Sequence, residues 1–218
     1  MMQFKEIQLC ADDFGLNPGV SSAIIKLLIM RRLSAVSCMV NMSDFNIQAQ
    51  ELLQLEIPFL KGLHFNLTEG HFLAAPDKPC YHLNKLLIQT HLGLINTSLI
   101  AQEFSAQLNH FIDVMGALPD FIDGHQHVHQ FPKIRQVVLE IYEQRLRQHK
   151  TLIRSTYPAI TLPMFQFKGR ILELTGGKKL SAYLQKNQIP HNVVFSGVYD
   201  FRQANYRNLF RQWLRLVP

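Results

Sequence analysis

Cysteine is scarce in this sequence, and the cysteines that occur form no redox or metal-binding motif. There are three, Cys10, Cys38 and Cys80, and none belongs to a CxxC pair. Cys10 and Cys38 lie in apolar runs, where a reduced and buried thiol is the usual state. We therefore expect free thiols rather than a disulfide framework.

Long apolar runs are missing as well. The best candidate, "AIIKLLIM", is interrupted by Lys26 and followed by Arg31 and Arg32, so it is too short and too charged for a membrane span. The first residues, "MMQFKEIQLC", lack the basic region, apolar stretch and small-residue cleavage site of a signal peptide. These absences predict a cytoplasmic protein without a membrane partner.

Charge is modest, with 17% charged residues and a formal net charge of +6. The lysines and arginines are spread along the chain, and no basic stripe interleaved with aromatic residues or nucleic-acid motif occurs. The excess of positive charge therefore predicts a solvated surface, not a nucleic-acid partner. With 47% apolar residues in 218 positions, the composition fits one globular α/β domain.

Strand and helix patterns alternate along the chain. Strands are expected over 6–12, 34–42, 59–67, 151–157 and 192–200, and a strand that runs into a loop is expected over 121–129. Helices are expected over 17–33, with Asn17 as N-cap and Pro18 at the first position, and over 43–55, 98–116, 132–147, 162–190 with a break at Gly176-Gly177, and 201–216. The segment 68–97 does not follow this alternation of strands and helices and is expected to be an insertion. This alternation predicts a mostly parallel sheet, either open or closed into a barrel.

Polar residues gather where the predicted strands end. Asp12 and Asp13 close the first strand, His64 lies near the end of the third, and "HQHVH" ends a later strand. The carboxyl ends of parallel strands carry the ligand sites of such folds. We therefore expect these residues on one rim.

The histidine cluster indicates a metal site. Side chains alternate along a strand, so His125, His127 and His129 share one side if the strand continues. Imidazole and carboxylate together suit zinc, iron, nickel or manganese. Hydrogen bonding within a loop is the alternative for each single histidine, but three within five residues beside Asp123 favour a site.

The adjacent aspartates have two interpretations. Asp12 could cap a turn, and Asp13-Phe14-Gly15 has ordinary turn chemistry. However, two carboxylates at the mouth of a buried strand repel each other and lose hydration, and a metal cation offsets both costs. Adjacent side chains point different ways, so one aspartate can bind the metal while the other acts as a general base.

Three motifs carry a family resemblance. "ADDFG" at 11–15, "GLHFNLTEG" at 62–70 and "DGHQHVHQFP" at 123–132 resemble the YdjC-like carbohydrate deacetylases, which include the chitooligosaccharide deacetylases. The resemblance extends to about Phe201. It implies an α/β fold, an incomplete or distorted (β/α) barrel of mostly parallel strands, as in the polysaccharide deacetylases.

Carried over by position, the resemblance implies a role for each motif residue. Asp13, His64 and His125 are the implied ligands of one divalent metal ion, magnesium or zinc, and Asp12 is the implied general base. The implied substrate-facing or second-layer residues are His127, His129 and Arg154. Members of the family usually continue to a C-terminal block with a histidine, which His191 does not match. We therefore expect residues 1–218 to be a single YdjC-like deacetylase domain without its C-terminal segment, and the general acid stays unassigned.

The implied reaction is hydrolysis of an N-acetyl group on an amino sugar or short chitooligosaccharide, with release of acetate. Insertion residues His71, Phe72, Tyr81 and His82 either form a wall of the sugar site or pack the loop. Two alternatives remain: another metal-dependent amidohydrolase or phosphoesterase, and a catalytically impaired carbohydrate-binding protein. A homodimer is also left open.

Overall fold

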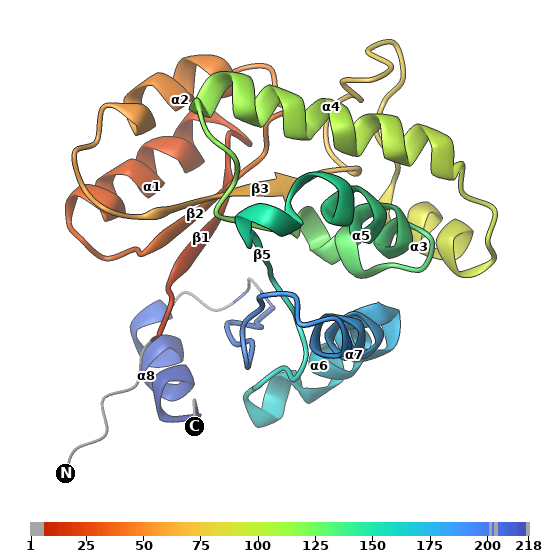
Figure 1. The fold of residues 1–218 in the computed structure, drawn as a ribbon. Coiled ribbons are helices and arrows are strands. Elements are labelled where there is room, and N and C mark those ends of the chain that lie inside the picture. Colours follow the sequence, from red (N-terminus) through yellow and green to blue (C-terminus); the bar gives the residue numbers. More distant parts are fainter. Residues whose placement is uncertain (1–6, 201, 203–204, 217–218) are drawn as a thin grey trace. The chain divides into compact units, whose positions relative to one another are not determined.

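The structure, a computed structural model, describes residues 7–200, 202 and 205–216 (Figure 1). The chain divides into two compact units. Of the described residues, the first unit takes those up to Leu83 together with Ser98–Gln126. The second takes Asn84–Thr97 and the residues from His127 onward. The expectation of one domain over 1–218 stays a prediction.

Parallel strands form the sheet of the first unit, in the order β1-β2-β3-β4. Their bounds are β1 Cys10–Phe14, β2 Ala35–Cys38, β3 Leu60–Phe65 and β4 Phe121–Gly124. Each strand lies beside its predecessor, so all four carboxyl ends meet at one edge. In this register His64 lies opposite Asp123. The sheet confirms the expected α/β class with parallel strands.

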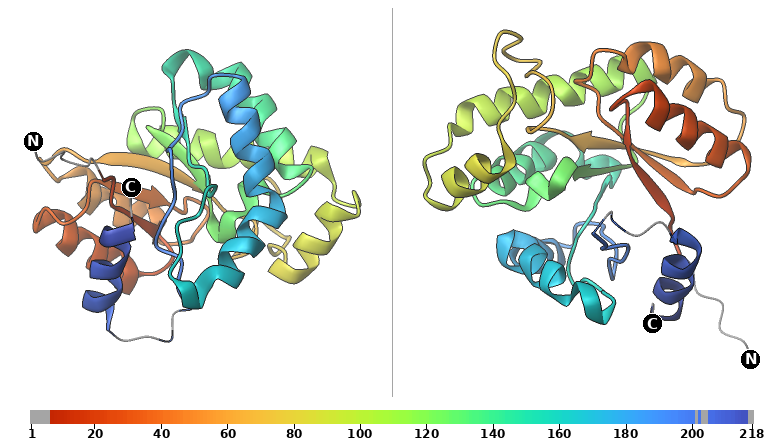
Figure 2. Two further views of the ribbon diagram at one scale, coloured as in Figure 1. Left: turned by 90° about the horizontal axis from the view of Figure 1, so that it is seen from below. Right: turned by 180° about the vertical axis from the view of Figure 1, so that it is seen from behind.

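The helices of the first unit follow from the apolar spacing of their sequences. They are α1 Pro18–Ile29, α2 Phe45–Leu53 and α4 Thr97–Met115, and they run along one side of the strands (Figures 1 and 2). The Asn17 side chain accepts a hydrogen bond from the Val20 N–H at 3.0 Å, so the predicted N-cap is confirmed. In α4, Phe104, Leu108 and Phe111 are buried at spacings of four and three residues.

The second unit is mainly helical. Its helices are α3 Leu83–His91, α5 Ile134–Arg145, α6 Gln166–Leu172, α7 Lys178–Lys186 and α8 Tyr206–Leu216, and its strand is β5 Leu152–Ile153. Short 3-10 helices cover Arg147–His149 and Pro163–Phe165, and a π-helical turn covers Glu173–Gly177; a further 3-10 helix, His125–Gln130, begins in the residues of the first unit and ends in those of the second. The predicted break at Gly176 is confirmed, because its φ of 132° lies outside helical values.

One predicted strand is wrong in this structure, and another needs its end defined. The strand expected to run into a loop within 121–129 ends at Gly124, because Gln126 and His127 take φ values of 50° and 60° and the chain coils into a 3-10 helix. Residues 192–200 form no strand: Phe195 makes one isolated parallel bridge with Ala159. Gly197, at φ 102°, takes the chain out of the extended region after it.

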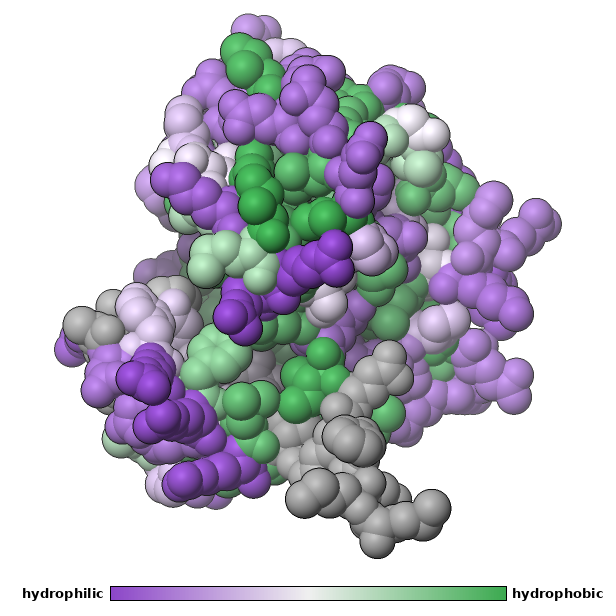
Figure 3. Space-filling view, turned by 90° about the vertical axis from the view of Figure 1, so that its left-hand side faces the viewer, coloured by the Kyte–Doolittle hydropathy of each residue, from purple (hydrophilic) through white to green (hydrophobic). Residues whose placement is uncertain are grey.

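The surface of the described residues keeps several large apolar side chains. In and beside α6, Met164, Phe167 and Leu174 are 64%, 75% and 80% exposed. Figure 3 shows hydrophobic residues interspersed with hydrophilic ones on the face it draws. None of the helices in the described part combines the length and the apolar character that crossing a membrane requires.

We predict that Gly62→Ala destabilises the first unit. Gly62 lies opposite Phe121 in the sheet, and a Cβ at this position would lie 2.3 Å from two carbons of the buried Phe121 ring. Overpacking of this kind costs about 1–3 kcal/mol of unfolding free energy. Urea unfolding of the wild type and the variant measures the change.

A double-mutant cycle with Phe121→Leu is the control, since the smaller side chain makes room for the added methyl group. The cost of Gly62→Ala should fall in that background. An equal cost in both backgrounds would show that Phe121 is not the cause.

Candidate metal centre

The polar residues singled out in the sequence come together in the first unit, at the carboxyl ends of its strands. Asp12 and Asp13 belong to β1, His64 to β3 and Asp123 to β4, and His125 follows β4 directly. These strands are joined by helices and loops that place residues 112 positions apart in hydrogen-bond contact. Of the residues predicted on one rim, Asp12, Asp13, His64 and His125 therefore lie there, with Asp123 beside them.

A β-bulge allows both adjacent aspartates to reach the same imidazole. Ala11 pairs with Val36 and Phe14 pairs with Cys38, so β1 carries one extra residue between these two pairs. Asp13 has a φ of 67°, a left-handed conformation that is uncommon for a residue with a side chain. The aspartates thus lie inside the strand, not at its end as expected, and the bulge overrides the strict alternation of faces.

Two histidine side chains contact the same oxygen of Asp13. Asp13 Oδ1 lies 3.2 Å from His64 Nε2 and 2.7 Å from His125 Nδ1. The ring centroids of the two histidines are 5.4 Å apart. One ligand atom from each of the three residues lies within 4.8 Å of the others. Ligand atoms that share one zinc ion at about 2.0–2.2 Å lie about 3–3.5 Å from one another, so this donor set fits a metal ion.

The other nitrogen of His64 is held by a buried carboxylate. Nδ1 lies 2.6 Å from Asp123 Oδ1, and Ser37 Oγ donates a hydrogen bond of 2.6 Å to the same oxygen. Asp123 and Ser37 are almost completely buried. A carboxylate on the far nitrogen of a histidine fixes the ring orientation and raises its basicity, as in carboxylate–histidine–zinc arrangements. The near nitrogen, Nε2, is thereby aimed at Asp13.

Asp12 belongs to a second set of possible metal ligands, together with His64 and Asp123. One carboxylate oxygen of Asp12, a ring nitrogen of His64 and an oxygen of Asp123 also lie within 4.8 Å of one another. This set shares His64 with the first. Asp123, however, is 1% exposed and already binds Ser37 and His64, so the first set offers a metal the more open donors.

The charges of the cluster favour a cation. Burial would raise the pKa of Asp13, but hydrogen bonds from His125 and His64 hold it well below its usual range. For His64, burial would lower the pKa, but the neighbouring Asp123 carboxylate outweighs it and raises the pKa to about 10. The carboxylates thus stabilise positive charge on or between the imidazoles, which a proton or a divalent metal ion supplies.

The remaining predicted site residues belong to the second unit. The rings of His127 and Phe195 pack edge to face, with centroids 5.7 Å apart. His129 is 2% exposed, and its Nε2 lies 2.9 Å from the carbonyl oxygen of Arg154. His125, His127 and His129 were expected on one side only if the strand continued, and this condition is not met, because the strand ends before them. Their proposed roles, and that of Arg154, stay predictions.

The predicted insertion contains a helix, α3, and a short bridge between His71 and Pro79. Phe72 is 3% exposed and packs against the ring of Tyr81 at 5.5 Å. The sequence left two roles open for these residues, a wall of the sugar site or packing of the loop, and the buried Phe72 packs the loop. His71 and His82 are exposed.

Sequence reasoning missed two polar residues beside the cluster. Ser37 stands in a strand of small and apolar residues, where nothing in the pattern marks it as polar support. Glu69 follows β3 in a loop, and its Oε1 lies 4.0 Å from His125 Nε2. Its place in "NLTEG", directly after the strand that carries His64, was the available signal.

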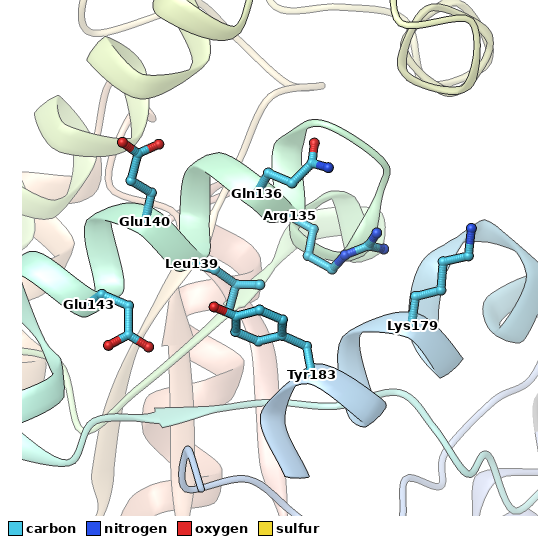
Figure 4. A pocket seen from close by; sticks show the side chains of 7 residues that line it. All are labelled: Arg135, Gln136, Leu139, Glu140, Glu143, Lys179 and Tyr183. Carbon is cyan, nitrogen blue, oxygen red and sulfur yellow. The ribbon is translucent and has the colours of Figure 1, made fainter. Parts of the chain in front are cut away.

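A hollow of about 370 Å³ lies elsewhere, between α5 and α7 in the second unit (Figure 4). It is lined by Arg135, Gln136, Leu139, Glu140, Glu143, Lys179 and Tyr183. None of the site residues predicted from the sequence lines it. Both basic and acidic side chains line the hollow, so its charge favours neither an anionic nor a cationic ligand.

Comparisons with known proteins agree with the motifs. The model of the family described as YdjC-like protein matches residues 6–217. A chitooligosaccharide deacetylase of Yersinia pseudotuberculosis is 37% identical over 133 residues, which are 59% of this chain and 52% of the relative. A carbohydrate deacetylase of Xenopus laevis is 32% identical over 161 residues, 68% of this chain and 50% of the relative. The chain thus spans about half the length of these relatives.

One solved structure is similar in fold. It is that of a protein from Enterococcus faecalis V583 proposed to act in cellobiose-phosphate cleavage, with a TM-score of 0.69 and 17% sequence identity, and the match covers 96% of this chain and 74% of that one. This likeness is consistent with an incomplete or distorted (β/α) barrel.

Proposed function

Because the chain belongs to the YdjC-like family, we propose that it is a metal-dependent hydrolase that removes N-acetyl groups from an amino sugar or a short chitooligosaccharide and releases acetate. The observation that carries the proposal is the convergence of His64 and His125 on one oxygen of Asp13. The relatives named as carbohydrate deacetylases support the choice of substrate.

Asp13, His64 and His125 are the proposed ligands of one divalent ion. Bound there, the ion supplies a Lewis acid that polarises the acetamide carbonyl and makes water a nucleophile at neutral pH. Two imidazoles with one carboxylate are more typical of zinc than of magnesium, and both ions are candidates. Asp123 holds His64 in the orientation that this role needs.

Asp12 is the proposed general base. It takes a proton from the attacking water as the new bond from oxygen to the acetyl carbon forms. The bond between that carbon and the sugar nitrogen then breaks, and the nitrogen takes up one proton from a general acid that stays unassigned, which balances the proton that Asp12 took from the water. For His129, burial and the contact with the Arg154 carbonyl support a positioning role, whereas His127 and the Arg154 side chain are proposed to face the substrate.

Metal removal is predicted to stop acetate release. The 218-residue chain is incubated with N,N′-diacetylchitobiose before and after treatment with a chelator, and again after zinc or magnesium is restored. We expect release that disappears with the chelator and returns with the ion, because the ligands alone do not activate water. Acetate release that is insensitive to the chelator would contradict the metal dependence.

A phosphodiester substrate, bis(p-nitrophenyl) phosphate, serves as the comparison. Its hydrolysis without acetate release would favour a metallophosphoesterase. Binding of the acetylated sugar with turnover of neither substrate would favour a carbohydrate-binding protein.

A further inference from the structure

Each of the two metal-facing histidines of the proposed site has a carboxylate near its other ring nitrogen. For His64 the partner is Asp123, whose Oδ1 lies 2.6 Å from Nδ1. For His125 the nitrogen that faces Asp13 is Nδ1, and the opposite nitrogen, Nε2, has Glu69 Oε1 at 4.0 Å. We propose that Glu69 is the positioning residue of His125, the counterpart of Asp123 for His64. This inference rests on the proposed metal site.

At 4.0 Å the carboxylate oxygen and Nε2 are close neighbours but too far apart for a direct hydrogen bond. The Glu69 side chain is 45% exposed, so it can rotate toward the imidazole, and a water molecule can also bridge a gap of this length. After rotation the carboxylate accepts the Nε2–H of His125 directly; with a bridging water, the water accepts the Nε2–H and donates to the carboxylate. The lone pair of Nδ1 is then directed at the position between Asp13 and His64.

The backbone of Glu69 is anchored independently of its side chain. Asn66 Oδ1 accepts a hydrogen bond from the Glu69 N–H at 3.1 Å, and Asn66 Nδ2 donates one of 2.8 Å to the Glu69 carbonyl oxygen. Asn41 Nδ2 donates a further one of 3.2 Å to the same carbonyl. A substitution that changes only the carboxylate therefore leaves the loop held at this residue.

Two side chains of helix α4, Gln107 and Glu103, hold the loop that contains Glu69 by hydrogen bonds to its backbone. Gln107 Oε1 accepts from the Asn66 N–H at 3.0 Å, and Gln107 Nε2 donates to the Asn66 carbonyl at 2.6 Å. Glu103 accepts from the backbone N–H groups of Leu73 and Ala74 at 3.0 and 2.8 Å. Asn66, Gln107 and Glu103 are fully buried, so the segment that carries Glu69 is pre-set before any metal binds.

The test measures zinc affinity in Glu69→Gln and Glu69→Ala by calorimetric competition with a chelator of known affinity. We expect about 10–100-fold weaker binding in Glu69→Ala, the usual cost of losing such a partner. Glu69→Gln should fall between the wild type and Glu69→Ala, because its amide oxygen still accepts the Nε2–H but carries no charge. Asp123→Asn gives the corresponding loss for His64, and Glu51→Gln, an exposed glutamate of α2, should match the wild type.

The visible absorption of the cobalt-substituted protein separates positioning from ligation. A positioning residue leaves the number of ligands unchanged, so the bands keep their intensity in both variants once the site is saturated. Unchanged zinc affinity in Glu69→Ala would overturn the inference, and so would a change in band intensity that shows a lost ligand. A wild-type chain that binds neither zinc nor cobalt would instead overturn the proposed metal site.

Discussion

Replacing His125 with alanine is expected to abolish both metal binding and turnover. The substitution removes one of the two imidazoles that converge on Asp13 Oδ1 and leaves His64 and Asp13 as the remaining donors of that set. A zinc site needs three protein ligands in its catalytic form. The loss should therefore exceed the roughly 10–100-fold cost of removing a residue that only supports a ligand, and turnover should fall with it.

Calorimetry with zinc and an acetate assay measure the two effects on the same preparation. His91→Ala is the matched control, because His91 is an exposed histidine at the end of α3. Circular dichroism and thermal unfolding of each variant show that the fold is retained. Wild-type zinc affinity in His125→Ala would remove this residue from the metal site.

The replacement of Asp12 by asparagine is expected to lower turnover but not metal binding, whereas His125→Ala is expected to abolish both. The asparagine side chain has nearly the same volume as that of aspartate but cannot accept a proton, so turnover should fall about 10²–10⁴-fold, the usual contribution of a general base. Metal affinity should stay close to the wild-type value, because the proposed ligands are Asp13, His64 and His125, and Asp13 contacts both histidines.

The measurement is kcat at saturating sugar together with zinc affinity, and Asp113→Asn, an exposed aspartate of α4, is the control. Two outcomes would contradict the assignment. Unchanged kcat would remove Asp12 from the mechanism. A loss of zinc affinity as large as in His125→Ala would make Asp12 a ligand, in line with the second donor set that it forms with His64 and Asp123.

Local signals in the sequence were sufficient for many elements. The apolar spacing of α4 predicts its length within one residue at each end, and Asn17-Pro18 predicts the start of α1. The alternation of strands and helices predicts parallel strands. That topology brings carboxyl ends together, so Asp13, His64 and His125 could be expected on one rim before any coordinates were known.

Other features had no local signal. The extended pattern of 192–200 suggested a strand, but side-chain hydrogen bonds of Asn192 and the positive φ of Gly197 replace a ladder there. The run "HQHVH" was compatible with a strand or a loop, and its residue types give no signal for the positive φ of Gln126 and His127.

The sequence by itself determined the chemistry available to the candidate site: which donors exist, that they lie in or beside the ends of strands, and that a YdjC-like pattern contains them. Only the tertiary structure decided how they are oriented. The bulge at Asp13 depends on one extra residue in β1. The contacts of Ser37 and Asp123 with His64, and of His125 with Asp13 and Glu69, join residues that are 27 to 112 positions apart. Such contacts follow from strand register and backbone conformation, and periodicity reports only which side of an element is buried.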